Sequence, residues 1–508
     1  MDAPYDISAI RRSSAEEAII PTALLEILHE FHRQQIAYCF WKSSRRLRAV
    51  LAGEGDIDLL VARTDQHRVQ LILVERDFKL FPSVGDREHP ATLSFLGYDE
   101  RTGQLIHIHL HFFLIVGEKL LKNYRLPWEA IFLNRAILHP TLPIQILDPA
   151  SEAVLLAVRA CLDLGRLDPI TLRLWRTTKR KFALDRTELA ARVDRALVHD
   201  LAARLLNEEL AGHVADAIYR EELPLTDARI RRRMRKHCAV YRSYNVVEAR
   251  ARSAGRSLFW LAGSMNKHLL HTPRPWNRRA PGGGCMIAMM GVDGSGKSTS
   301  VAAMQAWLSS KIDILPIYFG TGDGRPSLFF WPFKLMMPLM VRVLKSRRRN
   351  VSRRKISGGA PALPYRLLLI VWAVAVAMDK RTKLSTARRA ISRGLIVLTD
   401  RFPQDQIFGF NDGPSLTRLT MVPHWLRRFE SATYALARRV PPDLIIQLVV
   451  TPETAARREP SMDPETIRER IAALQRLEFP GAHVVRVDAE QPLPDVIRAV
   501  KREIWRLL

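Results

Sequence analysis

Apolar and polar positions in the first part of the chain follow two different periods. Residues 22–34 carry apolar side chains at helical spacing, whereas Ile57–Val61 is a short, mostly apolar run. Residues 105–113 alternate Leu or Ile with His, so that every second side chain lies on the same face of a strand. Alternating helix and strand patterns predict an α/β domain, which we assign to residues 1–150.

The pattern changes after residue 150. From 151 to 270, Ala, Leu and Arg recur at helical spacing without strand-like runs, which predicts a helical region. Its positions 229–236 hold six basic residues, which indicates a basic face. Residues 271–284 contain three prolines and end in three consecutive glycines, a composition typical of a linker.

Strand-like runs return in the last part of the chain, residues 285–508. The apolar runs 286–290, 394–399 and 444–450 alternate with helical segments. This order predicts a parallel sheet whose strands are joined by crossover helices. The whole chain is therefore predicted to be α/β, with a helical middle region.

One segment of the last part satisfies a phosphate-binding pattern at every fixed position. Residues 291–299 read GVDGSGKST, which fits G-x-x-x-x-G-K-[ST] and follows an apolar strand pattern. Glycines let backbone N–H groups converge on phosphates, Lys297 offers a positive charge, and Ser298 offers a hydroxyl to Mg²⁺. The motif predicts binding of ATP and Mg²⁺ by Gly291, Asp293, Gly294, Ser295, Gly296, Lys297, Ser298 and Thr299.

A charged pair, Asp400 and Arg401, ends the next predicted strand. In open α/β sheets the carboxyl ends of the strands face the ligand. Asp400 is a candidate to hold Mg²⁺ through water, and Arg401 is a candidate to bind a phosphate with two hydrogen bonds. A surface Asp–Arg pair without a ligand is the alternative.

These motifs occur in an order that resembles thymidylate kinases. The resemblance covers residues 286–508 and includes Asp400-Arg401-Phe402 and the Pro442-Asp443-Leu444 run before a later strand. It implies that Asp293 faces the sugar of an acceptor nucleotide and that Arg401 faces its phosphate. It also implies acceptor-side basic residues on a helix, Lys380 or Arg381, and a lid that supplies arginines to the transferring phosphoryl group, with the candidates Arg457, Arg458, Arg468 and Arg470.

Two stretches depart from the thymidylate kinase pattern. Residues 318–324 read YFGTGDG where the family has an Arg-Glu-Pro-Gly-Gly-Thr run that shapes the acceptor pocket. The base-contacting arginine of the family's acceptor helix corresponds here either to Lys380 or, shifted by one, to Arg381, and lysine lacks the planar fork of arginine. The expected acceptor is therefore a nucleoside monophosphate or a related phosphate- or hydroxyl-bearing compound, rather than thymidylate in particular.

The stretch 327–355 joins an apolar aromatic run to two basic triplets. This composition predicts an interface, with an anionic membrane surface as one partner. A packed helix followed by a basic loop is the alternative.

The first domain contains a pair of carboxylates, Asp56 and Asp58, which share one face of the predicted strand. Two such carboxylates can hold Mg²⁺ against a nucleoside triphosphate. With the preceding Trp41-Lys42-Ser43 they resemble the nucleotidyltransferase superfamily over residues 21–150. The superfamily's third carboxylate is absent from the later strand, where three histidines share a face instead: His107, His109 and His111. A metal-ligating histidine and an inactive site both remain open.

Charge and cysteine content narrow the class of protein. Lys and Arg number 78 against 52 Asp and Glu, and the resulting net charge of +26 favours an anionic partner. The sequence does not resemble a zinc finger, a helix-turn-helix or an aromatic stacking platform, so sequence-specific binding of nucleic acid is not expected. Four scattered cysteines, charged residues near the start and a longest apolar run of 12 residues favour a cytoplasmic protein, with attachment to the inner membrane face as an option.

The sequence therefore predicts an ATP-dependent phosphotransferase joined to a nucleotidyltransferase-like domain. Two alternatives differ in the part of the chain that acts. The first is a nucleotidyltransferase whose kinase-like domain senses nucleotide. The second is a non-catalytic protein that binds a membrane or a polyanion.

Overall fold

A computed structural model describes residues 19–89, 91–118, 120–163, 169–220, 227–270, 272–320, 363–407, 413–414, 416 and 422–508. The chain forms two compact units, Met1–Ser264 and Met265–Leu508. Both combine helices with a sheet that contains parallel strands, which confirms the predicted α/β class. The stretch 327–355, predicted as an interface, lies outside the described residues.

The sheet of the first unit has the order β3-β4-β5-β2-β1-β9-β8. Its central strands β2 and β5 are parallel, and Asp58 lies opposite His109 in their register. The predicted strand 105–113 therefore neighbours the strand that carries the two aspartates. The bounds are β1 Tyr38–Phe40, β2 Ile57–Val61, β3 Lys79–Leu80, β4 Thr92–Asp99, β5 Gln104–His111, β8 Ile137–Leu138 and β9 Gln145–Ile146.

Strand alternation gives this sheet two different faces. Leu59 and Ile108 join a core with Leu24 and Ile27 of α1 (Thr22–Arg33) and with residues of α3 (Gln66–Glu75). Side chains at the intervening positions point to the opposite face. The two aspartates and the three histidines of β5 therefore share that opposite face.

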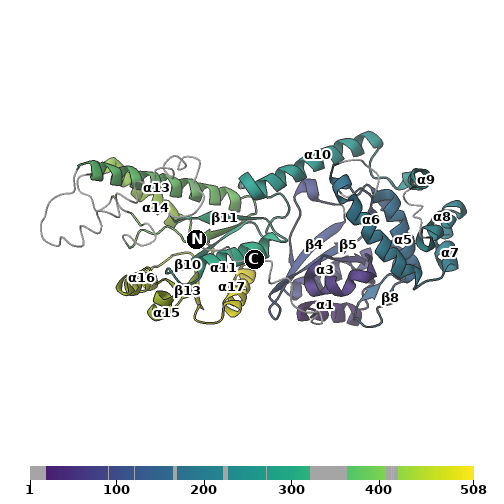
Figure 1. Cartoon of the computed structure of the whole chain (residues 1–508), viewed down its shortest axis with the longest axis horizontal. Helices are drawn as coiled ribbons and strands as arrows, with labels where there is room; N and C mark the ends of the chain where they lie inside the picture. Colours follow the sequence, from purple (N-terminus) through teal and green to yellow (C-terminus); the bar gives the residue numbers. More distant parts are fainter. Residues whose placement is uncertain are drawn as a thin grey trace. The chain divides into compact units, whose positions relative to one another are not determined.

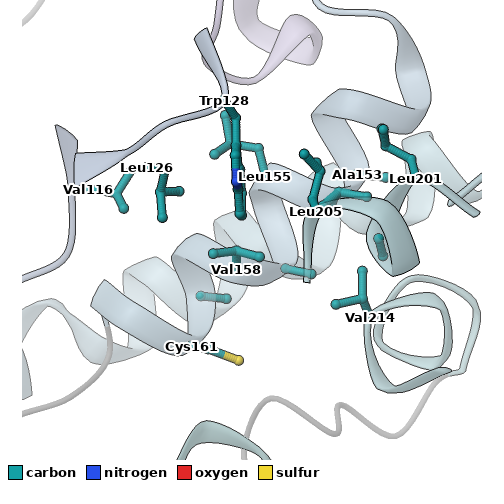
Figure 2. Close-up of a cluster of buried hydrophobic side chains, with 14 of the residues drawn as sticks. Val116, Leu126, Trp128, Ala153, Leu155, Val158, Cys161, Leu201, Leu205 and Val214 are labelled. Atoms are coloured by element: carbon teal, nitrogen blue, oxygen red, sulfur yellow. The ribbon is translucent and has the colours of Figure 1, made fainter. Parts of the chain in front are cut away.

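A helical region follows, as predicted, and shares a core with the sheet. Cys39 and Leu60 of the sheet belong to the same buried cluster as residues of α5, α7 and α8. Figure 2 shows this cluster, with Trp128 beside Leu155. The helices of this region are α5 Pro149–Asp163, α6 Pro169–Ala190, α7 Arg195–Leu205, α8 Glu208–Tyr219, α9 Ala228–His237 and α10 Val246–Met265. Three further elements of the first unit precede it in the chain: β6 Leu114–Val116, β7 Tyr124–Leu126 and α4 Glu129–Asn134.

The second unit contains a five-stranded sheet with the order β11-β12-β10-β13-β14, and every neighbouring pair is parallel. From the central strand β10 the chain continues to β11 at one edge and to β12, and it then crosses to β13 and β14 on the other side of β10. This change of direction creates a topological switch point at the carboxyl end of β10, where α/β sheets bind ligands. The strands are β10 Cys285–Gly291, β11 Ile314–Tyr318, β12 Ile396–Asp400, β13 Leu444–Val449 and β14 His483–Asp488.

Helices cover both faces of this sheet. In Figure 1, α13 and α14 lie together on one side, and α11 and α17 lie together on the other. Among the described residues, no helix has the length and apolarity needed to cross a membrane. The helices are α11 Lys297–Ser309, α13 Leu363–Ile391, α14 His424–Arg439, α15 Pro452–Arg458, α16 Pro464–Arg476 and α17 Leu493–Leu507.

The core shown in Figure 2 can be tested by truncating one of its leucines. Leu155 is 2% exposed, so Leu155→Ala should lower the free energy of unfolding of the first unit by about 2–5 kcal/mol. Leu197→Ala is the matched control, because Leu197 is 54% exposed on α7 and its loss should cost less than about 0.5 kcal/mol. Urea titration followed by circular dichroism measures both changes, and equal shifts would contradict the shared core.

Candidate functional site

The loop predicted to bind phosphate joins β10 to α11 at the switch point of the second sheet. β10 ends at Gly291, and α11 begins at Lys297. In the sheet register Met289 lies opposite Asp400 on one side, and Gly291 lies opposite Leu448 on the other. The ends of β12 and β13 therefore flank the loop, and Ser298 and Thr299 are exposed in the first turn of α11.

Glycines shape this loop in two ways. Gly294 and Gly296 have φ values of 82° and 86°, in the left-handed region that glycine adopts without strain. Gly291 and Gly294 also allow close packing. A Cβ atom on Gly291 would lie 2.3 Å from Oγ of Ser295, and one on Gly294 would lie 2.8 Å from the carbonyl oxygen of Ala455 in α15.

Lys297 carries a charge in a largely buried position. Its side chain is 7% exposed, its Nζ donates a hydrogen bond to the carbonyl oxygen of Val292 (2.6 Å), and Oδ1 of Asp293 lies 3.9 Å away. Burial lowers the pKa of Lys297 to about 8, although Asp293 opposes this shift. The ammonium group is therefore held in place inside the loop by one carbonyl and one carboxylate.

Asp293 is the centre of a cluster of opposite charges. Nη2 of Arg401 lies 3.2 Å from its Oδ1, and Arg470 of α16 forms an ion pair with its Oδ2. With Lys297, three cations from three parts of the fold surround one carboxylate. The arrangement brings together three predicted site residues, Asp293, Lys297 and Arg401, with Arg470 of the predicted lid.

Arg401 has an unusual backbone conformation for an arginine. Its φ is 67°, and its N–H donates to the carbonyl oxygen of Met289 (3.0 Å). A left-handed conformation costs a residue with a Cβ atom about 1–2 kcal/mol. Such strain is typical of functional positions, and here it fixes the direction in which the guanidinium leaves the sheet.

Asp400 fits the expected magnesium site. Burial raises the pKa of Asp400 above its usual value, although Lys297, Arg401 and a hydrogen bond with Ser298 act to lower it. Its buried Oδ1 has no hydrogen-bond partner within the described part of the chain. A hydroxyl and a partly unsatisfied carboxylate side by side match the oxygen ligands that Mg²⁺ takes. The assignment of Ser298 and Asp400 to this ion stays a prediction.

Two of the predicted lid arginines, Arg457 and Arg458, make different contacts. Arg458 donates to the carbonyl oxygen of Ala489 (3.2 and 3.3 Å) and reaches that of Gly294 (3.5 Å). Arg457 donates to Oγ1 of Thr454 within α15 (3.3 Å). Arg458 therefore contacts the loop directly in this structure.

Two predicted acceptor-binding residues lie on α13 and contact α14. Lys380 is 1% exposed, and its Nζ donates to Oη of Tyr434 (3.2 Å). Arg381 is exposed, with its guanidinium 6.0 Å from the ring centroid of Phe429. Their role as acceptor-side cations stays a prediction.

The first unit contains a second polar cluster, around Asp58. Nε2 of His111 lies 3.0 Å from Oδ1 of Asp58, Nδ1 of His109 lies 3.5 Å from the same oxygen, and Nζ of Lys42 lies 3.3 Å from Oδ2. Burial acts to raise the pKa of Asp58, but Lys42 and the two histidines lower it well below its usual value. Asp58 is therefore charged, and it is the residue that organises the cluster.

Asp56 makes a separate pair with His107, whose Nδ1 lies 2.6 Å from Oδ1. Burial lowers the pKa of Lys122 to about 8, and the nearby carboxylates of Asp163 and Asp58 oppose this shift. Arg159 lies above the Trp41 ring, 5.5 Å from the ring centroid. The sequence did not single out Lys122 or Arg159, because each is an isolated cation on a loop or a helix with no motif around it.

No protein-family model matches this chain. The chain is 30% identical over 229 residues to the uncharacterized ATP-binding protein YghS of Escherichia coli K12, a match that covers 44% of this chain and 93% of YghS. It is 26% identical over 237 residues to the uncharacterized ATP-binding protein YghR of the same strain, covering 46% and 90% of the two chains. The parallel sheet and its glycine-rich loop define a P-loop domain. The chain belongs to the family that includes YghS.

The buried charge of Lys297 makes a prediction about stability. Below pH 8 the folded protein must hold a desolvated ammonium group, so Lys297→Met should raise the free energy of unfolding of the ligand-free second unit by about 1–3 kcal/mol at pH 7. The difference should shrink as pH rises from 8 to 10.5, because the lysine is then neutral when folded and still protonated when unfolded. Urea unfolding at pH 7 and pH 9.5 measures this, and a gap that does not narrow would be inconsistent with a depressed pKa.

A pair of glycine variants separates backbone strain from steric clash. Gly294→Ala and Gly296→Ala both place a Cβ atom at positive φ, at a cost of about 1–2 kcal/mol each. Only Gly294→Ala also meets the carbonyl oxygen of Ala455, since nothing lies within 4 Å of a Cβ on Gly296. Gly294→Ala should therefore destabilise the protein more, by about a further 1–3 kcal/mol in urea unfolding. The reverse order would show that α15 does not pack on the loop.

Proposed function

We propose that the second unit is an ATP-dependent phosphotransferase that transfers a phosphoryl group to a nucleoside monophosphate or a related acceptor. The relatives YghS and YghR are named as ATP-binding proteins, which supports ATP as the donor. The observation that carries the proposal is the cluster of three cations, Lys297, Arg401 and Arg470, around Asp293 at the switch point of the sheet. Phosphoryl transfer needs positive groups on both sides of the moving phosphoryl group, and this cluster supplies them.

The donor side is formed by the loop and the start of α11. Backbone N–H groups of the loop and the N-terminus of α11 would face the phosphates. Lys297 would contribute a positive charge, and burial would strengthen its attraction for a phosphate. Binding of a triphosphate places more negative charge beside Lys297, so the ammonium form is favoured in the complex. When Mg²⁺ is bound, Ser298 and Asp400 would hold it, and the ion would neutralise charge on the donor phosphates.

The acceptor side is formed by Arg401 and Arg470, which are held by Asp293. The ion pairs with Asp293 position both arginines before a phosphate arrives. A phosphate would then compete with the carboxylate for the same guanidinium groups. Arg401 comes from the strained end of β12 and would bind the acceptor phosphate. Arg470 comes from α16 and would stabilise the transferring phosphoryl group.

α15 and α16 provide the means to exclude water from the reaction. Arg458 and Ala455 contact the loop, and Arg470 reaches Asp293, so both helices touch the site. If these helices close over bound substrates, water is excluded and wasteful hydrolysis of ATP is suppressed. The candidate catalytic residues are therefore Lys297, Asp400, Arg401, Arg457, Arg458 and Arg470.

An activity screen with purified full-length protein tests the proposal. ATP, Mg²⁺ and a panel of nucleoside monophosphates and phosphorylated sugars are incubated with the protein, and ADP and phosphorylated products are separated by chromatography. Lys297→Ala should abolish product, Arg401→Ala should mainly raise the acceptor KM, and Arg470→Ala should lower kcat by about two to four orders of magnitude. Arg506→Ala is the matched control, since Arg506 lies on α17 and pairs with Glu503.

The products also distinguish the alternatives. Phosphoryl transfer releases ADP, whereas nucleotidyl transfer releases pyrophosphate. Pyrophosphate formation that survives Lys297→Ala would assign the chemistry to the first unit. Calorimetric binding of ATP without turnover of any acceptor would indicate a nucleotide-binding protein instead of an enzyme.

A further inference from the structure

The cluster around Asp58 in the first unit has the composition and spacing of a metal site. Parallel pairing of β2 and β5 places Asp58 opposite His109, and the alternation of β5 puts His107, His109 and His111 on the same face as the aspartates. Asp58, His109 and His111 offer one oxygen and two nitrogen atoms, all within 4.8 Å of one another. These residues belong to the first unit, so the inference does not depend on the phosphate-binding loop.

The distances within this cluster can be compared with those around a bound ion. Imidazole nitrogens and carboxylate oxygens bind metals at about 2.0–2.2 Å, so two ligands of one ion lie about 3.0–3.5 Å apart at tetrahedral or octahedral angles. Oδ1 of Asp58 lies 3.0 Å from Nε2 of His111 and 3.5 Å from Nδ1 of His109. Both separations have the size expected for ligands of a shared ion.

The neighbouring group, Asp56 with His107 and His109, fits less well. Oδ1 of Asp56 lies only 2.6 Å from Nδ1 of His107, which is a hydrogen-bond distance and shorter than two ligands of one ion normally approach. His109 is shared by the two groups and can serve one ion. The set centred on Asp58 is therefore the better site, and Asp56 is left to orient His107.

The second oxygen of Asp58 is already occupied by a cation. Nζ of Lys42 lies 3.3 Å from Oδ2, and it also lies 4.7 Å from the centroid of the Trp41 ring. Trp41 in turn packs edge-on against His111, with ring centroids 5.0 Å apart. Lys42 and Trp41 thus fix the carboxylate and one imidazole in place, which leaves Oδ1 directed at the two histidines. Ligands that are held in this way lose little freedom when an ion binds.

The donor set also decides the kind of ion. Mg²⁺ prefers oxygen ligands and keeps several waters, whereas imidazole suits the divalent ions of the first transition series and zinc. Two imidazoles and one carboxylate form the two-histidine, one-carboxylate set found with such ions. This set uses two of the three histidines whose role the sequence left open, and it differs from a Mg²⁺ site formed by Asp56 and Asp58 alone.

We propose that Asp58, His109 and His111 bind a divalent transition-metal or zinc ion in the first unit. The side chains of these ligands retain 13%, 20% and 11% exposure, so none of the three is completely shielded from solvent. Three protein ligands leave at least one further position on the ion for water or another ligand.

Equilibrium dialysis of metal-free, full-length protein tests this proposal. The protein is dialysed without nucleotide against Co²⁺, Mn²⁺ or Zn²⁺ in the presence of excess Mg²⁺, and bound metal is measured by mass spectrometry. We expect one ion per chain, retained against Mg²⁺, and bound Co²⁺ should show visible absorption perturbed by nitrogen ligands. His109→Ala and His111→Ala should each weaken binding by at least about tenfold.

His67→Ala is the matched control, since His67 is an exposed histidine of α3. Its metal binding should equal that of the unaltered protein, and so should that of Lys297→Met, which affects only the proposed ATP site. The inference is overturned if no tested ion survives competition by Mg²⁺, or if bound Co²⁺ is unaffected by both histidine variants. Because the absorption of Co²⁺ is recorded on unaltered protein, a variant that fails to fold does not prevent a decision.

Discussion

Lys297 keeps a positive charge in a position with little access to water, and the second unit is arranged to compensate for it. Desolvation of an ammonium group is costly, so a nearby carbonyl and carboxylate are needed to hold it. The same burial strengthens its attraction for an incoming phosphate, because charges interact more strongly where water is excluded. Stability of the free protein and affinity for an anionic ligand are therefore opposed at this residue.

The parallel sheet determines which charged residues meet at that lysine. β10 lies between strands that come later in the chain on both sides, so their carboxyl ends converge on one loop. Arg401 arrives from β12, and Arg470 arrives from a helix that follows β13. Asp293 holds both arginines close to Lys297, and its negative charge reduces the repulsion among the three cations. The site is thus held together by the pairing of strands as much as by the loop itself.

A parallel pair of strands has a similar effect in the first unit. β2 and β5 bring carboxylates and imidazoles into register on one face, while apolar side chains on the other face form a core with α1 and α3. The buried apolar face fixes the register, because a shift by one residue would turn Asp58 into the apolar core and remove Leu59 from it. Hydrophobic packing on one side of the sheet therefore positions the polar cluster on the other.

The sequence alone determined the features that depend on short stretches of chain. Glycine spacing identified the loop within residues 291–299, alternation placed three histidines on one face, and apolar runs identified three strands of the second sheet, β10, β12 and β13. These features are local, since the backbone conformation of a few residues decides them. They were sufficient for the α/β class and for most of the residues around the loop.

Only the tertiary structure decided which distant residues meet. Arg470 and Asp293 are 177 positions apart, and His111 and Asp58 are 53 apart, so no local pattern reports their contact. Isolated residues such as Lys122 and Arg159 gave no signal, because their importance comes from burial and from neighbours in space. Long-range contacts depend on how strands pair and helices pack, and that arrangement is set by the sum of many weak interactions that no single motif contains.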